Sequence, residues 1–335
     1  MKTAKLEVFL LLMATPAAAQ VDRELSVRWK YEQAAPLNIQ QRGIEERGNA
    51  KIYDLTFASP LDGRSKAVGP NGGIVSAYLV VPTGKGRKGP FPAVIYGHWC
   101  MPGSQKKNRT EFLEEAVVLA QSGVISLLPD HVSVRPGFVE DDAAFSENQV
   151  AVMVQQVVNL RRAADLLSAR PDVEAKRIAY VGHSCDAGAG GFLSGVDKRF
   201  KAFVLMAGDL SDEVDKKSKS FQEFRQKAGP EKLDAFMTEH AWMDAGKYVS
   251  HALPAAVFLQ FASDEPFMDQ EMEKGYFEVV SQPKTMKIYR AQHALSPEAT
   301  RDRIRFLAER LSFKAPPQSD VDKIPALVQP PWPKQ

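Results

Sequence analysis

Apolar and polar positions along the chain change their period in a way that predicts strands followed by helices. Residues 51–57 alternate apolar and polar side chains, which is typical of a half-buried strand, and residues 74–81 form the next run. From residue 91 onward, short continuous apolar runs alternate with longer amphipathic segments. Continuous apolar runs are expected of strands that are buried on both faces of a parallel sheet.

The alternation predicts the fold class. The strands expected beyond residue 90 cover residues 91–96, 124–128, 178–181, 202–206, 255–261 and 285–289. The helices expected between and after them cover residues 109–121, 147–169, 187–193, 270–280 and 297–311. Repeated β–α units of this kind predict an α/β fold with a mostly parallel central sheet and helices on both faces.

Two segments depart from the alternation. Residues 20–48 are polar and mixed, and we expect a helix or a surface arm there. Residues 209–250 are charged and helix-prone without a strand signal, which predicts a small helical insertion that covers a site as a lid. Lys216, Lys217 and Lys219 in this insertion favour a solvated face over a binding patch.

The two ends of the chain differ in composition from the middle. A positively charged start, an apolar run at 8–14 and an A-x-A pattern at 17–19 predict a signal peptide over residues 1–19. We therefore expect an exported protein, either periplasmic or secreted. Residues 314–335 are rich in proline and predict an extended tail, which leaves residues 20–313 as a single domain.

Composition and motif content narrow the classes of function. A formal net charge of +2 over 335 residues gives no sign of a nucleic-acid partner. Beyond the signal peptide no run of 18 apolar residues occurs, so we expect no membrane span. The sequence has no H-E-x-x-H motif, no zinc-type cluster of Cys and His, and no G-x-G-x-x-G after a strand. We expect no metal and no cofactor.

A serine lies between the strand predicted at 178–181 and the small-residue helix at 187–193. The connecting segment, residues 182–186, reads G-H-S-C-D. A tight strand-to-helix turn lifts the hydroxyl of Ser184 clear of the sheet and places it at a helix N-terminus, which favours developing negative charge. This arrangement resembles the nucleophile elbow of the α/β-hydrolase family.

The resemblance makes Ser184 the expected nucleophile, with an ordinary helix-capping serine as the alternative. The usual motif is G-x-S-x-G, and here Asp186 occupies the last glycine position. A carboxylate has to fit a crowded turn there, although it could cap the helix. Cys185 is the poorer candidate nucleophile, because it would need glycine at positions 183 and 187.

A second segment matches the loop that contributes to the oxyanion hole in this family. The loop follows the strand at 91–96 and often contains His-Gly, whereas this chain has His98 followed by Trp99. The resemblance implies that the backbone N–H groups of Cys100 and Cys185 bind the oxyanion, with the Trp99 N–H as a rival for the first. We expect His98 to be structural.

The other members of a catalytic triad are expected after the last two strands. His293 lies in a short loop before the last predicted helix, where the family has its general base. Asp264 directly follows a buried strand, where the family has its acid, and the adjacent Glu265 is the alternative. The order Ser, acid, His along the chain is that of α/β-hydrolases.

The resemblance covers about residues 50–313 and implies a function. We expect a serine hydrolase, of the carboxylesterase type, that cleaves small-molecule esters through an acyl-enzyme intermediate. The family also includes dienelactone-hydrolase-like enzymes and peptidases, so a peptidase-like hydrolase is one alternative. A non-catalytic binding protein on the same fold is another, and Asp186 and Trp99 are the features that favour it.

The only two cysteines of the chain lie in the two loops of the predicted oxyanion hole. If the N–H groups of Cys100 and Cys185 converge on one oxyanion, their Cα atoms must lie close together, and export would permit a disulfide. Converging N–H groups do not require converging side chains, so a pair of free cysteines is the alternative.

Overall fold

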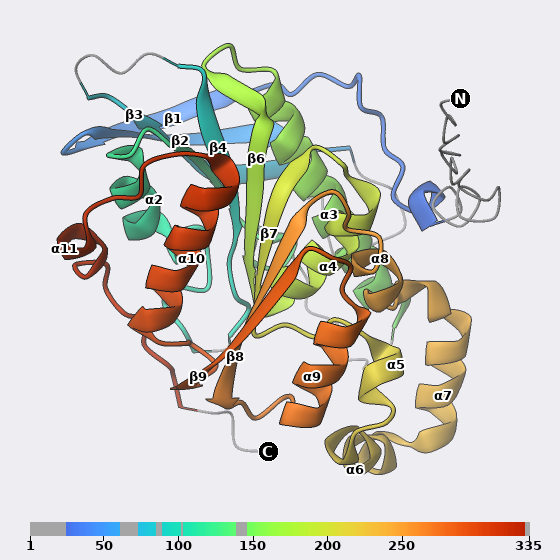
Figure 1. The fold of residues 1–335 in the computed structure, drawn as a ribbon. Coiled ribbons are helices and arrows are strands. Elements are labelled where there is room, and N and C mark those ends of the chain that lie inside the picture. Colours follow the sequence, from blue (N-terminus) through green and yellow to red (C-terminus); the bar gives the residue numbers. More distant parts are fainter. Residues whose placement is uncertain (1–24, 61–72, 85–88, 102, 139–145, 332–335) are drawn as a thin grey trace, which may run out of the picture.

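A computed structural model describes residues 25–60, 73–84, 89–101, 103–138 and 146–331 of the chain. The predicted signal peptide, residues 1–19, lies outside them. The described residues form a nine-stranded sheet in the order β1-β2-β3-β5-β4-β6-β7-β8-β9 (Figure 1). Neighbouring strands from β5 to β9 are parallel, and β1, β2 and β3 form an antiparallel edge. The predicted α/β fold with a mostly parallel sheet is confirmed.

The elements follow the chain in the expected alternation. The strands are β1 (Gln40–Arg47), β2 (Ala50–Ala58), β3 (Ile74–Pro82), β4 (Phe91–Gly97), β5 (Ile125–Pro129), β6 (Val173–His183), β7 (Phe200–Met206), β8 (Ala256–Asp264) and β9 (Lys284–Gln292). The helices are α2 (Leu113–Ala120), α3 (Glu147–Ser168), α4 (Cys185–Val196), α5 (Asp212–Asp215), α6 (Lys219–Ala228), α7 (Pro230–Glu239), α8 (Gly246–Val249), α9 (Gln270–Val279), α10 (Pro297–Leu311) and α11 (Gln318–Val321).

Helices cover both faces of the sheet and create two apolar cores. On one face α3, α4 and α9 contribute Val157, Leu193 and Tyr276 to a core against the strands. On the other face α2 and α10 contribute Leu119 and Leu307 to the second core (Figure 1). The central strands are buried on both sides, which explains why their sequences are continuous apolar runs.

The expectation of a helix or arm over residues 20–48 is wrong for its second half. Residues 40–47 form β1, which pairs antiparallel with β2 and has a register shift between Gln41 and Gly43. Nearly every side chain of β1 is exposed on both faces. An edge strand that buries nothing has no apolar period, so the hydrophobic pattern gave no signal for it.

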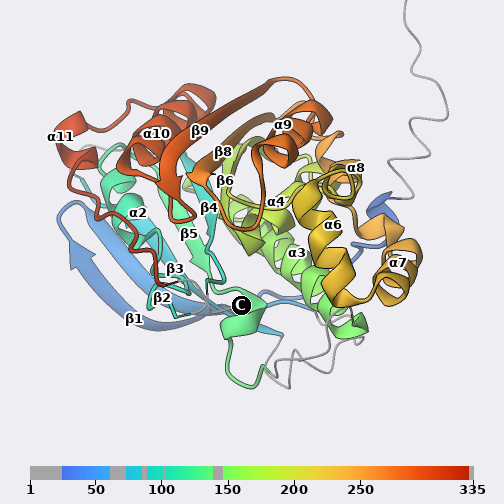
Figure 2. The same ribbon diagram turned by 90° about the horizontal axis from the view of Figure 1, so that it is seen from below.

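Residues 209–250 are helical, as their sequence predicts. They connect β7 to β8 through α5, α6, α7, a short 3-10 turn at Ala241–Met243 and α8. Figure 2 shows α6 and α7 projecting beside α3 and α9. Trp242 packs its ring against Trp29, with 5.8 Å between the ring centroids, and lies under the Arg28 guanidinium.

In the described part of the proline-rich tail, residues 314–331, the only helix is the single turn of α11. Val321 is buried in the core formed by α2 and α10. Further along, the Gln329 side chain accepts a hydrogen bond of 3.0 Å from the backbone N–H of Ala294. The tail therefore packs on the domain through these contacts. None of the helices in the described residues is long and apolar enough to cross a membrane.

We predict that Trp29 anchors the segment before β1. Its indole is fully buried and lies 4.9 Å from the Phe192 ring and 5.5 Å from the Tyr248 ring, measured between centroids. Trp29→Ala should lower the free energy of unfolding by about 3–5 kcal/mol, because it leaves a large cavity. Phe224→Ala, at an aromatic side chain that is 48% exposed, is the control and should cost less than about 1 kcal/mol. Urea denaturation measures both, and equal losses would contradict the prediction.

Candidate active site

Ser184 occupies a sharp turn between the central strand β6 and helix α4. Its backbone has φ 55° and ψ −119°, a conformation that costs a non-glycine residue of the order of 1–3 kcal/mol. The Ser184 N–H donates to the carbonyl of Met206 in the neighbouring strand at 2.8 Å, which ties the strained turn to the sheet. Strained residues of this kind cluster at functional sites.

Glycines make room for the turn. A Cβ on Gly182 would lie 2.3 Å from the carbonyl oxygen of Asp186, and a Cβ on Gly208 would lie 2.4 Å from the Cβ of Ala187. Real Cβ atoms do not approach other atoms so closely, so both positions need glycine for α4 to start where it does.

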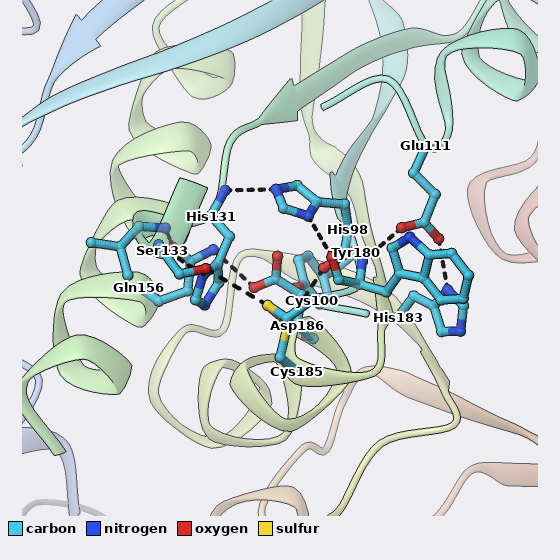
Figure 3. Close-up of a disulfide and its surroundings, with 12 residues drawn as sticks. His98, Cys100, Glu111, His131, Ser133, Gln156, Tyr180, His183, Cys185 and Asp186 are labelled. Carbon is cyan, nitrogen blue, oxygen red and sulfur yellow. Dashed lines mark hydrogen bonds and ion pairs between the residues drawn. A yellow bond between two sulfur atoms is a disulfide. The ribbon is translucent and has the colours of Figure 1, made fainter. Parts of the chain in front are cut away.

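Asp186 fits the elbow because Gly97, at the end of the facing strand β4, leaves space for its side chain. Its side chain is fully buried, and a Cβ on Gly97 would lie only 2.6 Å from the Asp186 Cβ. The Gln156 side-chain amide donates to Asp186 Oδ1 at 2.8 Å (Figure 3). Burial raises the pKa of Asp186 to about 8, so this carboxyl is mostly neutral at pH 7. Asp186 replaces the last glycine of the motif, and Gly97 at the end of β4 compensates for it by leaving room for the larger side chain.

A disulfide joins Cys100 to Cys185, and their Cα atoms lie 5.9 Å apart (Figure 3). The hypothesis of a bond between these residues is therefore confirmed. It links the loop after β4 to the first residue of α4. The backbone N–H of Trp99 is already engaged, because it donates to Glu111 Oε2 at 2.6 Å. Of the two rivals for the first oxyanion donor, the geometry therefore favours Cys100 over Trp99.

His98 is buried and bound on both sides of its ring. The backbone N–H of His131 donates to Nε2 at 2.9 Å, so Nε2 is an acceptor. Nδ1 lies 2.8 Å from the carbonyl oxygen of Trp99 and must therefore donate to it. These contacts hold the loop after β4 and agree with a structural role for His98.

His293 follows β9 and is almost fully buried. Its Nδ1 lies 2.8 Å from Glu265 Oε2, and the Glu265 side chain is 1% exposed. The second carboxylate oxygen accepts a hydrogen bond from the backbone N–H of Phe267 at 3.3 Å. Because a carboxylate accepts, Nδ1 carries the proton and Nε2 of the neutral ring is left as the basic nitrogen. Burial lowers the pKa of His293, while the hydrogen bond to Glu265 raises it.

The structure places Glu265, and not Asp264, against His293. Asp264 is the last residue of β8 and is exposed. The register between β8 and β9 shifts between Ala262 and Asp264, so side chains no longer alternate regularly at the strand end. The sequence-based preference for Asp264 rested on its position after the buried strand, and the alternative, Glu265, is the residue that contacts His293.

Ser184, Cys185 and His293 line one cavity of about 450 Å³. Its other walls are mainly apolar and include two acidic side chains. These walls include Met153, Phe192, Asp209, Asp212, Met243, Ala245, Phe267, Met268, Met272 and Tyr276. The segment 209–250 thus contributes to this cavity through Asp209, Asp212, Met243 and Ala245, whereas Trp242 faces Trp29.

Two polar residues beside the site were missing from the sequence-based set. Glu111 contacts Trp99, and it also lies 2.7 Å from Nδ1 of His183, the residue before Ser184. The position of His183 next to the serine could have singled it out from the sequence. Nothing in the sequence around its partner Glu111 indicates this contact. Glu111 lies in the turn before α2, in a segment predicted simply as amphipathic helix.

Among the residues that the structure describes, three groups of side chains have donor atoms within 4.8 Å of one another and could hold a metal ion. They are Cys100, His131 and Cys185; Glu147, Glu239 and His240; and Asp209, Asp212 and Asp215. In the first group the two cysteines are joined in the disulfide. In the third, the Tyr276 hydroxyl donates to Asp215, and its oxygen also lies 3.4 Å from Asp209 Oδ1. Burial raises the pKa of Asp212 to about 7 and that of Asp215 to about 9, so this group is partly protonated at neutral pH.

No protein-family model matches the chain, and no curated protein matches it in sequence. Solved structures do match. An acetyl xylan esterase from Thermoanaerobacterium sp. JW/SL YS485 is 14% identical over 87% of this chain and 93% of its own, with a TM-score of 0.66. An acetyl xylan esterase from Paenibacillus sp. R4 is 18% identical over 88% and 93%, with a TM-score of 0.64. A glucuronoyl esterase from Solibacter usitatus is 13% identical over 86% and 91%, with a TM-score of 0.59. The chain therefore has the α/β-hydrolase fold shared by these esterases.

Proposed function

We propose that the protein is a serine ester hydrolase in which Ser184 is the nucleophile, His293 the general base and Glu265 the triad acid. The observation that carries the proposal is the strained serine at the start of α4, which opens into the same cavity as a histidine bound to a buried carboxylate. A serine hydroxyl is a weak nucleophile at neutral pH, and such a histidine is what activates it.

The proposed reaction follows from these positions. His293 Nε2 takes the proton of Ser184 as its oxygen attacks the ester carbonyl, and the alkoxide leaving group then takes that proton as the acyl-enzyme forms. Water, deprotonated by the same nitrogen, attacks the acyl-enzyme, and that proton then passes from His293 to the departing Ser184 oxygen as the acid is released. Glu265 orients the ring and stabilises its charged form. The N–H of Cys185, at the positive end of α4, and that of Cys100 donate to the oxyanion.

The substrate class we propose is a small-molecule ester with a short acyl group. A cavity of about 450 Å³ with mainly apolar walls has room for a compact acyl group. The similar structures include two acetyl xylan esterases, which also supports a short acyl group. We propose that residues 209–250 act as a lid that sets acyl preference through Met243.

We also propose that the mature protein is exported after removal of residues 1–19. The disulfide supports this proposal, since such bonds persist in oxidising compartments and are rare in the cytosol.

Removal of either proposed catalytic side chain should abolish most of the activity. We expect Ser184→Ala and His293→Ala to lower kcat for p-nitrophenyl acetate by about 10⁴-fold, because members of a triad act as one unit. His251→Ala, which changes another histidine outside the cavity, is the control and should retain the rate. A fluorophosphonate should label Ser184 alone. Near wild-type turnover in both variants would exclude the triad and favour a binding protein.

The acid assignment makes a comparison of two neighbouring residues informative. Glu265→Gln should lower kcat by about 10³- to 10⁴-fold, while Asp264→Asn should change it less than about threefold. The acidic limb of kcat/KM should move as well. The base works when deprotonated, so activity falls as the pH drops through the pKa of His293, which burial lowers from the usual range of a histidine. Glu265→Gln removes the negative charge that raises this pKa, so the limb should shift to lower pH. A larger loss of kcat in Asp264→Asn than in Glu265→Gln would show that Asp264 is the triad acid.

The disulfide should matter more for turnover than for folding, since it links the two loops that donate to the oxyanion. We expect Cys100→Ser combined with Cys185→Ser to lower kcat by up to about 100-fold, because loss of one oxyanion donor has an effect of this order. Circular dichroism at working temperature should show a retained fold. Thiol counting on the denatured, unreduced wild type should find no free thiol, and an unchanged kcat would show that the bond is purely structural.

A further inference from the structure

One buried carboxylate connects two loops of the proposed site. The Glu111 side chain is 3% exposed. Its Oε2 accepts the backbone N–H of Trp99, in the loop after β4, at 2.6 Å. Its Oε1 lies 2.7 Å from Nδ1 of His183, which directly precedes Ser184 (Figure 3). Both distances lie at the short end of the range for charge-assisted hydrogen bonds.

The connection extends to a third loop. Nε2 of the fully buried His183 ring lies 2.9 Å from the backbone carbonyl oxygen of His293. Glu111 and His183 therefore join the loop after β4, the elbow at the end of β6 and the loop after β9. These three loops hold the proposed oxyanion donor, nucleophile and base.

The hydrogen bonds fix one of the two ring protons of His183. A carbonyl oxygen can only accept, so Nε2 of His183 must carry a proton. Glu111 Oε2 already accepts a hydrogen bond from the Trp99 N–H. If Nδ1 of His183 is protonated as well, Glu111 Oε1 accepts a second one. With an imidazolium and a carboxylate, both ring nitrogens and both carboxylate oxygens have partners, which is the condition under which a buried ion pair is tolerated.

Aromatic packing supports a charged ring at this position. The Trp99 indole stacks on His183 with 5.1 Å between ring centroids and an 18° angle between the planes. The same indole faces His293 at 6.2 Å, and the two imidazoles lie 5.3 Å apart. A cation over an indole face is stabilised by the ring quadrupole.

We propose that Glu111 and His183 form an ionised positioning pair, which holds the oxyanion loop and the backbone of His293 in register with Ser184. The inference rests on the proposed function for its kinetic consequences, whereas the protonation of His183 is independent of any activity. The positive charge of His183 also opposes protonation of the neighbouring base, and its effect on the pKa of His293 has that direction.

The protonation state has a direct spectroscopic test. In ¹⁵N-histidine spectra of the wild type at neutral pH, the His183 ring should have both nitrogens protonated. This signal should be absent from His183→Asn, which assigns it, and the Glu111→Gln variant should contain His183 as a neutral ring. A neutral His183 in the wild type would overturn the ionised pair.

Two substitutions at Glu111 separate charge from geometry. In Glu111→Gln the amide oxygen can still accept from Trp99 and the amide N–H can donate to a neutral His183, so the loops stay in place without the charges. We expect kcat to fall by about 10-fold with KM within about twofold. Glu111→Ala removes both contacts and should lower kcat by about 100-fold, because small displacements of reacting groups have effects of this order.

Glu114→Gln is the matched control, since Glu114 belongs to α2, is 40% exposed and pairs with Arg47. It should leave kcat unchanged. If a thermal melt shows that Glu111→Ala is not folded at the assay temperature, the kinetic comparison is made with the folded Glu111→Gln variant alone. Unchanged kcat in the folded Glu111 variants, or a change in KM alone, would overturn the positioning role. Failure of the proposed function itself is distinguishable, because the wild type would then neither turn over ester nor label at Ser184.

Discussion

The whole site depends on one strained backbone turn, in which the chain leaves β6 and enters α4 within a single residue. Ser184 adopts a positive φ there, and its N–H is tied to β7. Because β4, β6, β8 and β9 are parallel members of one sheet, their carboxyl ends meet along the same edge. The loops that follow them therefore surround the turn.

The turn has consequences for the residues around it. Close packing at Gly182 and Gly208 leaves no volume for side chains at these positions, and the Asp186 side chain occupies space that Gly97, the last residue of β4, leaves open. A carboxyl thus lies beside the disulfide that joins the loop after β4 to α4.

The sequence allowed the parallel sheet, the position of Ser184 and the loop of His293 to be predicted, because each rests on local pattern. Buried strands are continuous apolar runs, and the serine lies at a strand-to-helix junction. The choice between Asp264 and Glu265 depended on a register shift between two strands, and β1 depended on pairing with β2. Glu111 is 72 residues away from His183 in the chain, so only the tertiary structure brings them together. Long-range contacts of this kind have no period and no motif.

The exposed strand β1 has a further consequence for the molecule in solution. A sheet edge presents unpaired N–H and C=O groups, to which a strand of another chain can add. Here the edge is interrupted by the register shift near Gly43 and ends in the charged residues Glu45, Glu46 and Arg47, of which Arg47 is bound to Glu114 of α2. An incoming strand would have to match a bent ladder and displace that ion pair. The same polarity that hid β1 from the hydrophobic pattern thus disfavours the addition of another strand at this edge of the sheet.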